Sequence, residues 1–324
     1  MKTHSSQKIL AGGFAFALAL TGCSDETSSS ADTDDGEIQT VTVGVMPVAV
    51  TAAFEYGTEQ GIFEQHGLDV DIQSGQGGAA ALPAVSGGSL DLAIGNPLSI
   101  MIAADQGLDM RIVSGYAAPP IENDMTNGIV VQADSGIETW RDLEGKTVAV
   151  NAVQTQGDLV VKGAVANDGG DPDEVKFTEL GFPDMEAQLE IGNVDAIWQP
   201  EPFLTANLNN PERANLGSAN AAVIDELPPL VVFTSADYAE ANSELLDTFE
   251  SALAEVLEAA SEDSDGFRQQ VSEYLDMPME VAEVMTIDEL GTEIAPNALP
   301  ELADLAFEYG YIDDEVDLDT IVLD

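Results

Sequence analysis

Apolar residues along the chain follow two alternating periodicities. The runs 41–45 and 68–72 alternate apolar residues with small or polar ones, which is typical of strands. Between them, segment 52–65 carries apolar residues at helical spacing. Two further strands are predicted at 91–94 and 110–113, with a helix between them. The repeated strand–helix–strand order predicts an α/β fold with a parallel, doubly wound sheet.

The same rhythm restarts near residue 127 and predicts a second, smaller α/β lobe. Strands are expected at 128–132, 146–150, 175–180 and 195–198, and helices at 137–143, 158–167 and 185–191. A strand at 230–233 then returns to the first lobe, followed by amphipathic helices at 243–260, 266–275, 280–290 and 299–309. We therefore predict a first lobe of residues 40–131 plus 225–324 and a second lobe of residues 132–224. Two crossings, near 131–133 and 222–227, form a hinge.

The N-terminus has the features of a secretory leader. Lys2 and Lys8 precede an apolar run, 9–20, that is too short to span a bilayer. The run closes with Leu20-Thr21-Gly22-Cys23, which resembles a bacterial lipobox. We expect residues 1–22 to be a signal peptide, Cys23 to carry lipid, and the polar, acidic segment 23–39 to be a flexible tether. The expected location is extracytoplasmic, with the protein anchored to the cell membrane by its lipid.

Charge narrows the range of partners. The chain has 60 Asp and Glu residues against 9 Lys and Arg, a net charge of −51. Such a surface repels nucleic acid and anionic lipid, so nucleic acid is excluded as a partner and membrane contact must be through the anchor. Self-repulsion on this scale suits a salt-adapted, halophilic host, in which salt screens the charges.

The sequence lacks the residues of common catalytic and metal sites. It contains neither the G-x-S-x-G motif of serine hydrolases nor the H-E-x-x-H motif of zinc proteases. Gly145-Lys146-Thr147 is similar to the end of a phosphate-binding loop, but it leads into a strand, whereas such a loop leads into a helix. Cys23 is the only cysteine and His66 is the only histidine outside the leader, which excludes an internal disulfide and a multi-cysteine metal site. We therefore expect a protein that is not an enzyme and has no cofactor and no metal.

Four stretches in order carry a resemblance to a known family. They are residues 59–70, 84–95, 142–150 and 192–203. Together they resemble the extracytoplasmic solute-binding proteins of nitrate/sulfonate/taurine-type ABC importers, a family that includes binders of thiamine-pyrimidine precursors. The resemblance implies a two-lobed fold like that of type II periplasmic binding proteins, with a ligand cleft between the lobes. It also implies a monomer that delivers a small organic solute to a membrane permease and its ATPase.

The cations depart from the pattern expected of nitrate binders, which present cationic or histidine side chains to the anion. After the leader the chain has seven: Arg111, Arg141, Lys146, Lys162, Lys176, Arg213 and Arg268. None lies in a loop that we place at the cleft. We therefore expect a neutral or singly anionic organic solute, sulfonate-like or taurine-like, with any acidic group held by helix N-termini and neutral donors.

Candidate ligand contacts follow from the rule that ligands bind beyond the carboxyl ends of strands. They are Val48, Gly77, Gly78, Asn96, Tyr116, Asn151, Gln154, Thr155, Gln156, Phe182, Trp198 and Glu201. The glycines also suit ordinary turns, and Tyr116 and Trp198 suit packing in the core or cleft wall. Glu201 suits a hydrogen bond at the hinge better than a charge partner for the ligand.

Three alternatives remain open at this point. The solute could be a thiamine-pyrimidine precursor or an aromatic acid. The fold could serve a pyrimidine-synthesising enzyme, although the relatives of that kind are cytoplasmic and use a lysine and a cysteine-rich segment. A sensory lipoprotein would share the cleft but have no permease partner.

Overall fold

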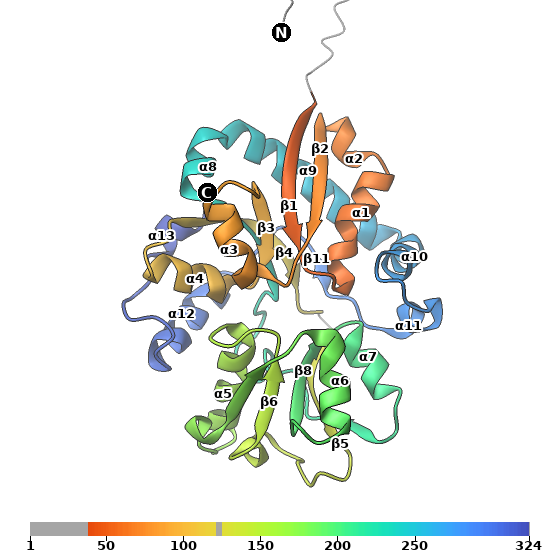
Figure 1. Ribbon diagram of the computed structural model, residues 1–324. Coiled ribbons are helices and arrows are strands. Elements are labelled where there is room, and N and C mark those ends of the chain that lie inside the picture. The colour runs from red at the N-terminus through yellow and green to blue at the C-terminus, as the bar shows by residue number, and fades with distance from the viewer. Residues whose placement is uncertain (1–37, 121–124, 324) are drawn as a thin grey trace, which may run out of the picture. The chain divides into compact units, whose positions relative to one another are not determined.

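The fold is built from two β-sheets, each covered by helices (Figure 1). The computed structural model describes residues 38–120 and 125–323. The leader, Cys23 and almost all of the predicted tether lie outside the described residues. The described residues form a single compact unit that contains both sheets.

The first sheet has six strands in the order β2–β1–β3–β10–β4–β11. Its strands are β1 (Gln39–Val45), β2 (Leu68–Ser74), β3 (Leu92–Gly95), β4 (Met110–Ala118), β10 (Leu230–Ser235) and β11 (Glu289–Leu290). The helices of this first lobe are α1 (Ala52–Glu59), α2 (Ile62–Gln65), α3 (Gly78–Ser86), α4 (Pro97–Asp105), α8 (Ala236–Ala241), α9 (Ser243–Glu262), α10 (Ser264–Tyr274), α11 (Met279–Val284), α12 (Ala298–Glu308) and α13 (Leu318–Ile321).

The second sheet has five strands in the order β7–β6–β8–β5–β9. Its strands are β5 (Asn127–Gln132), β6 (Thr147–Val150), β7 (Lys176–Glu179), β8 (Ala196–Pro200) and β9 (Arg213–Asn215). The second lobe adds helices α5 (Gln156–Asn167), α6 (Phe182–Glu190) and α7 (Phe203–Leu208). Short 3-10 helices are η1 (Ala49–Thr51), η2 (Trp140–Leu143) and η3 (Pro172–Glu174).

The two-lobed α/β architecture is confirmed, but both sheets are mixed rather than wholly parallel. β1 runs parallel to β2 and β3, whereas β10 is antiparallel to β3 and β4. In the second sheet β6 is parallel to β7 and β8, whereas β5 is antiparallel to β8 and β9. A strand that comes directly from the other lobe begins at the edge where the neighbouring strands end, so it runs opposite to them.

The strand register places the crossings between the lobes. Asn127, at the start of β5, pairs with Pro200 at the end of β8, so β5 lies entirely in the second sheet. The first crossing therefore precedes Asn127, whereas the sequence pattern predicted it near 131–133. The second crossing lies between β9 and β10, a range that includes the predicted 222–227.

Aromatic rings on α1, α2, α9 and β4 form the centre of the first lobe. The Phe54 ring stacks on Tyr116, with ring centroids 5.5 Å apart, and lies 6.2 Å from Phe63 and 6.5 Å from Phe249. All four side chains are buried. The long helix α9 buries one apolar stripe there, which explains why its helical periodicity is so clear in the sequence.

One predicted helix is shorter than expected. The segment 280–290 forms α11 only as far as Val284 and then becomes extended, with β11 at the edge of the first sheet. The Arg268 guanidinium donates hydrogen bonds to the carbonyls of Ala282 and Met285, which satisfies the end of α11. A side chain from α10 thus caps α11 at a point where the local pattern would continue the helix.

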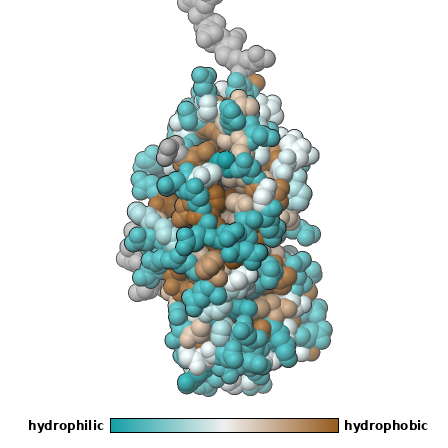
Figure 2. All heavy atoms as spheres, turned by 90° about the vertical axis from the view of Figure 1, so that its left-hand side faces the viewer, coloured by the Kyte–Doolittle hydropathy of each residue, from teal (hydrophilic) through white to brown (hydrophobic). Residues whose placement is uncertain are grey.

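The described surface is largely polar. Figure 2 shows one face on which hydrophilic residues predominate and hydrophobic residues are exposed between them. Within residues 38–120 and 125–323, no helix is long and apolar enough to cross a membrane.

Candidate functional site

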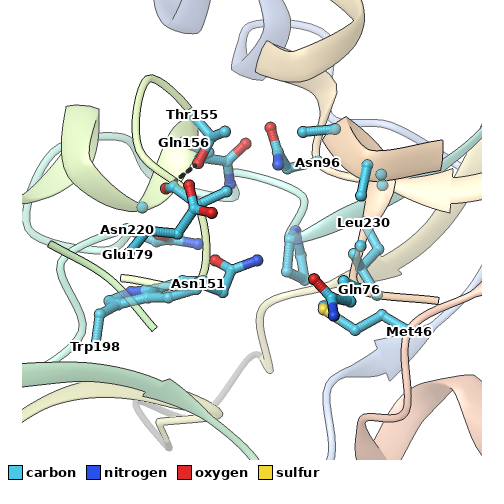
Figure 3. Close-up of a pocket in the computed structure, with 18 residues that line it drawn as sticks. Met46, Gln76, Asn96, Asn151, Thr155, Gln156, Glu179, Trp198, Asn220 and Leu230 are labelled. Carbon is cyan, nitrogen blue, oxygen red and sulfur yellow. Dashed lines mark hydrogen bonds between the residues drawn. The ribbon is translucent and has the colours of Figure 1, made fainter. Parts of the chain in front are cut away.

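A pocket lies where strand ends of the two sheets face each other, with a volume of about 100 Å³ (Figure 3). A single water needs only about 10–15 Å³ of such space, so the pocket has room for more than one water molecule. The labelled side chains of the first-lobe wall are Met46, Gln76, Asn96 and Leu230, and those of the second-lobe wall are Asn151, Thr155, Gln156, Glu179, Trp198 and Asn220.

Backbone-to-backbone contact shapes the first-lobe wall. A Cβ atom on Gly78, at the start of α3, would lie 2.4 Å from the Cα of Gly95 at the end of β3. A Cβ on Gly95 would lie 2.7 Å from the Cα of Gly78. Gly77 precedes them with a φ of +118°, which side-chain-bearing residues rarely adopt. Only glycines allow α3 to approach β3 this closely.

Asn96 both lines the pocket and caps a helix. Its Oδ1 accepts hydrogen bonds from the backbone N–H of Ser99 (2.9 Å) and from the Ser99 hydroxyl (3.1 Å). This is the usual N-cap arrangement, and it begins α4. The side-chain oxygen of Asn96 is therefore already used by the fold.

The second-lobe wall contains the start of α5. Thr155 is its N-cap, and its backbone N–H donates to Oδ1 of Asp158 (2.8 Å). The helices α3, α4 and α5 all begin at pocket-lining residues. Their N-termini bring positive partial charge and backbone donors toward the cavity.

Two buried amide oxygens in the second-lobe wall have no hydrogen-bond partner among the described residues. They are Oε1 of Gln156 and Oδ1 of Asn220, and each side chain is only 3% exposed. The Gln156 side-chain amide N–H donates a hydrogen bond to the carbonyl of Pro228 (3.4 Å). The indole Nε1 of Trp198 is likewise buried without a partner. Because leaving such groups unpaired is costly, each is expected to bond an ordered water or a ligand.

The pocket has no positive side chain among the described residues that line it. Its one ionisable side chain is Glu179, whose carboxylate accepts a hydrogen bond from the backbone N–H of Val153 (3.3 Å). Positive character therefore comes only from helix N-termini, and a carboxylate opposes it.

A smaller, more apolar compartment adjoins the pocket and shares Met46, Trp198, Pro229 and Leu230 with it. Val48 and Phe182 line this compartment, and the Phe182 and Trp198 ring centroids are 5.8 Å apart.

Two carboxyl groups also lie at this compartment. Burial raises the pKa of Glu201, although hydrogen bonds from the Thr205 hydroxyl (2.7 Å) and backbone N–H (3.0 Å) oppose the shift. Burial raises the pKa of Asp288 to about 7, and its carboxyl accepts a hydrogen bond from the Thr126 hydroxyl.

The twelve candidate residues separate into three groups. Seven line the pocket: Gly77, Gly78, Asn96, Asn151, Thr155, Gln156 and Trp198. Val48, Phe182 and Glu201 line the adjoining compartment. Tyr116 and Gln154 line neither.

Local contacts explain why Tyr116 and Gln154 line neither the pocket nor the adjoining compartment. Tyr116 is fully buried in the aromatic core, where its hydroxyl donates to the carbonyl of Val50 (2.8 Å). Gln154 adopts a left-handed φ of +59° and contributes its backbone N–H to Asp158.

The pocket also includes polar residues that the sequence pattern did not indicate: Gln76, Glu179 and Asn220. Gln76 is in the Gly-rich turn that the pattern singled out for its glycines. Glu179 is the last residue of β7, whereas the strand was predicted to end one residue later. Asn220 belongs to an irregular segment between β9 and β10, where neither periodicity gives a signal.

The described residues show no cluster of three or more His, Cys, Asp and Glu side chains that could hold a metal ion.

Comparison with known proteins shows that residues 49–266 match the family described as NMT1/THI5 like. The chain belongs to the NMT1/THI5-like family.

Curated relatives match a shorter stretch. A formylaminopyrimidine-binding protein of Halalkalibacterium halodurans is 26% identical over 182 residues, which cover 56% of this chain and 52% of that protein. A putative binding protein of Brucella abortus is 27% identical over 152 residues, or 46% of this chain and 44% of that protein. The chain thus spans about half the length of these relatives.

Solved structures share the fold. The alkanesulfonate-binding protein of Xanthomonas axonopodis pv. citri, bound to MOPS, superposes with a TM-score of 0.75 at 18% identity, covering 89% of this chain and 99% of that one. The nitrate-binding protein of Synechocystis PCC 6803 gives a TM-score of 0.70 at 15% identity, covering 88% and 86%. These similarities confirm the periplasmic-binding-protein fold predicted from the sequence.

Proposed function

We propose that this protein is the solute-binding component of an ABC importer and that its ligand is a small, neutral organic molecule carrying N–H donors. The observation that supports this most strongly is the pair of buried, unpartnered amide oxygens on Gln156 and Asn220. Two acceptors in one wall suit a ligand with two N–H donors. The exocyclic amino group of an aminopyrimidine, a planar nitrogen heterocycle, carries two N–H bonds.

The charge of the pocket supports a neutral ligand over an anion. Its lining includes the Glu179 carboxylate and no cation among the described residues. A buried anion with no cationic partner would have to rely on the N-termini of α3, α4 and α5 against that carboxylate. The similarity to a protein named for binding formylaminopyrimidine supports the same ligand class.

A sulfonate is the second candidate, because three helix N-termini do converge on the pocket. The similarity to an alkanesulfonate-binding protein supports this alternative only at the level of fold. The two candidates differ in charge, so a binding experiment separates them.

Calorimetry with 4-amino-2-methylpyrimidine, taurine and nitrate tests the ligand class. We expect the pyrimidine to bind, and Gln156→Ala to weaken its binding about 5- to 150-fold, the effect of losing one buried hydrogen bond of about 1–3 kcal/mol. The matched control is Gln269→Ala, an exposed glutamine on α10. Binding of taurine or nitrate without binding of the pyrimidine would contradict the proposed ligand class.

Asn96→Ala is a less clean probe than Gln156→Ala. The Asn96 oxygen caps α4, so its loss should destabilise the protein by about 1 kcal/mol whether or not Asn96 touches the ligand. Stability must therefore be measured beside affinity for this variant.

We further propose that Cys23 carries lipid and anchors the protein to the membrane. If Cys23 carries lipid, Cys23→Ala should leave the precursor unprocessed or release the protein from membranes, because the acidic body is repelled by anionic lipid. Membrane fractionation provides the measurement. Correctly processed variant protein retained at wild-type levels would contradict the lipid anchor.

A further inference from the structure

The turn that carries Thr155 and Gln156 into the pocket is held from outside the pocket by one carboxylate. Asp158 accepts hydrogen bonds from the backbone N–H of Gln154 (2.9 Å) and from the backbone N–H of Thr155 (2.8 Å). It accepts a third from the Tyr311 hydroxyl (2.8 Å). Two of the three donors thus belong to the turn, and the third comes from a residue 153 positions later.

Tyr311 reaches Asp158 because the C-terminal segment packs on both lobes. Helix α12 contacts α4 of the first lobe and α5 of the second. Gly310 then takes a left-handed φ of +70°, and the Tyr311 N–H donates to the carbonyl of Ala306 (2.8 Å). This glycine-terminated helix end redirects the chain, so that the Tyr311 side chain turns toward α5.

The contact between the Asp158 and Tyr311 side chains is buried. Asp158 is 4% exposed and Tyr311 is 8% exposed, so little water can replace the hydroxyl if it is lost. Burial raises the pKa of the Asp158 carboxyl, while the hydrogen bonds from Thr155 and Tyr311 oppose that shift. A buried carboxylate needs such donors, and removing one leaves an acceptor unsatisfied.

The turn itself needs outside support. Gln154 has a φ of +59°, which a residue with a side chain seldom adopts unless surrounding contacts impose it. The bond from its N–H to Asp158 is such a contact. The orientation of the Asp158 carboxylate therefore bears directly on the geometry of residues 154–156.

We infer that Tyr311 is a positioning residue for the ligand site: through Asp158, its hydroxyl holds the 154–156 turn and so places Thr155 and Gln156 in the pocket wall. The C-terminal segment after α12 is thereby coupled to ligand binding. The effect on affinity rests on the proposed function, whereas the effect on the turn does not require any ligand.

The competing explanation is that Tyr311 serves only as a packed ring. It belongs to the apolar cluster that includes Leu302, Ala306 and Ile312. Tyr311→Phe separates the two roles, because it keeps the ring and removes the hydroxyl. Tyr309→Phe is the matched control, since it is the same substitution two residues earlier on a partly exposed tyrosine.

The first test uses the ligand-free protein and residue-resolved amide hydrogen exchange. In Tyr311→Phe we expect the Gln154 and Thr155 amides to exchange at least about tenfold faster relative to β6 amides such as Val148, and Tyr309→Phe to leave the ratio unchanged. Equal acceleration of the turn and β6 would indicate lost overall stability alone and overturn the proposal. An unchanged turn in Tyr311→Phe would also overturn it.

The second test measures affinity for 4-amino-2-methylpyrimidine by calorimetry. We expect about five- to tenfold weaker binding in Tyr311→Phe and no change in Tyr309→Phe. Wild-type affinity in Tyr311→Phe would overturn the coupling to the site. If the wild-type protein does not bind this probe, the proposed function fails, and hydrogen exchange of the turn still decides the role of Tyr311.

Discussion

The two walls of the pocket are built in different ways. The first-lobe wall depends on close backbone packing, since a Cβ on either Gly78 or Gly95 would clash with the other residue, and the Asn96 side-chain oxygen is occupied in capping α4. The second-lobe wall presents side chains whose buried polar atoms remain unpartnered, on Gln156 and Asn220. The first lobe therefore determines mainly the shape of the pocket, and the second lobe mainly its hydrogen-bonding pattern.

The largest expected effect comes from the first-lobe wall. Gly95→Ala places a Cβ 2.7 Å from the Cα of Gly78, and neither backbone segment can yield without moving α3 or β3. We expect a loss of about 3 kcal/mol in the free energy of unfolding, measured by urea denaturation. Gly75→Ala is the control, because its Cβ would meet only the Val45 carbonyl oxygen, at 3.8 Å. Equal stability of the two variants would mean that the close approach does not shape this wall.

A matching change in the second-lobe wall should affect binding instead of stability. Asn220→Ala removes a buried acceptor without a partner, so we expect the free energy of unfolding to stay within about 0.5 kcal/mol of wild type. Affinity for the pyrimidine should fall about 5- to 150-fold in calorimetry. Asn209→Ala, an exposed residue of the same lobe, should change neither quantity. A large stability loss with unchanged affinity would reverse the roles that we assign to the two walls.

The pH dependence of stability tests the region where the lobes join. Asp288 has a pKa of about 7 when folded and an ordinary value of 3.8. Between these values the folded state holds a proton that the unfolded state releases, so its contribution to stability falls as pH rises from about 4 to about 7.

The size of this pH effect is modest. A pKa shift from 3.8 to about 7 would correspond to about 4 kcal/mol, but Asp288 is only half-buried, so solvent screening reduces the expected effect to about 1–2 kcal/mol. Asp288→Asn stays neutral and should lose this part of the pH dependence, as urea titrations at several pH values would show. Parallel curves for variant and wild type would contradict the raised pKa.

The smallest expected effect concerns the indole of Trp198, which lies at the boundary between the pocket and the adjoining compartment. Trp198→Phe keeps an aromatic ring beside Phe182 and removes the unpartnered Nε1 donor. We expect affinity to fall about two- to tenfold, or about 0.5–1.5 kcal/mol. Trp140→Phe, at the only other tryptophan of the chain, is the control. No difference between the two variants would mean that the second-lobe wall recognises the ligand without this donor.

Strand ends were the most informative sequence feature for the pocket. Asn96 and Asn151 directly follow strands whose ends the apolar pattern marks, and both line the cavity. Tyr116 also lies near a predicted strand end, where an aromatic residue suits the core as well as a cleft wall. In the structure its ring packs on Phe54 in the core. The sequence pattern did not indicate Asn220, because the irregular segment that contains it has neither helical nor strand periodicity.

The local elements, the α/β class and the family follow from the amino-acid sequence alone, because helical and strand periodicities and short turn motifs are properties of neighbouring residues. Three features required the folded chain: which strands run antiparallel, which amide oxygens are buried without partners among the described residues, and the hydrogen bond from Tyr311 to Asp158. These features depend on residues far apart in the chain, and burial or pairing there is determined by packing that no local pattern encodes.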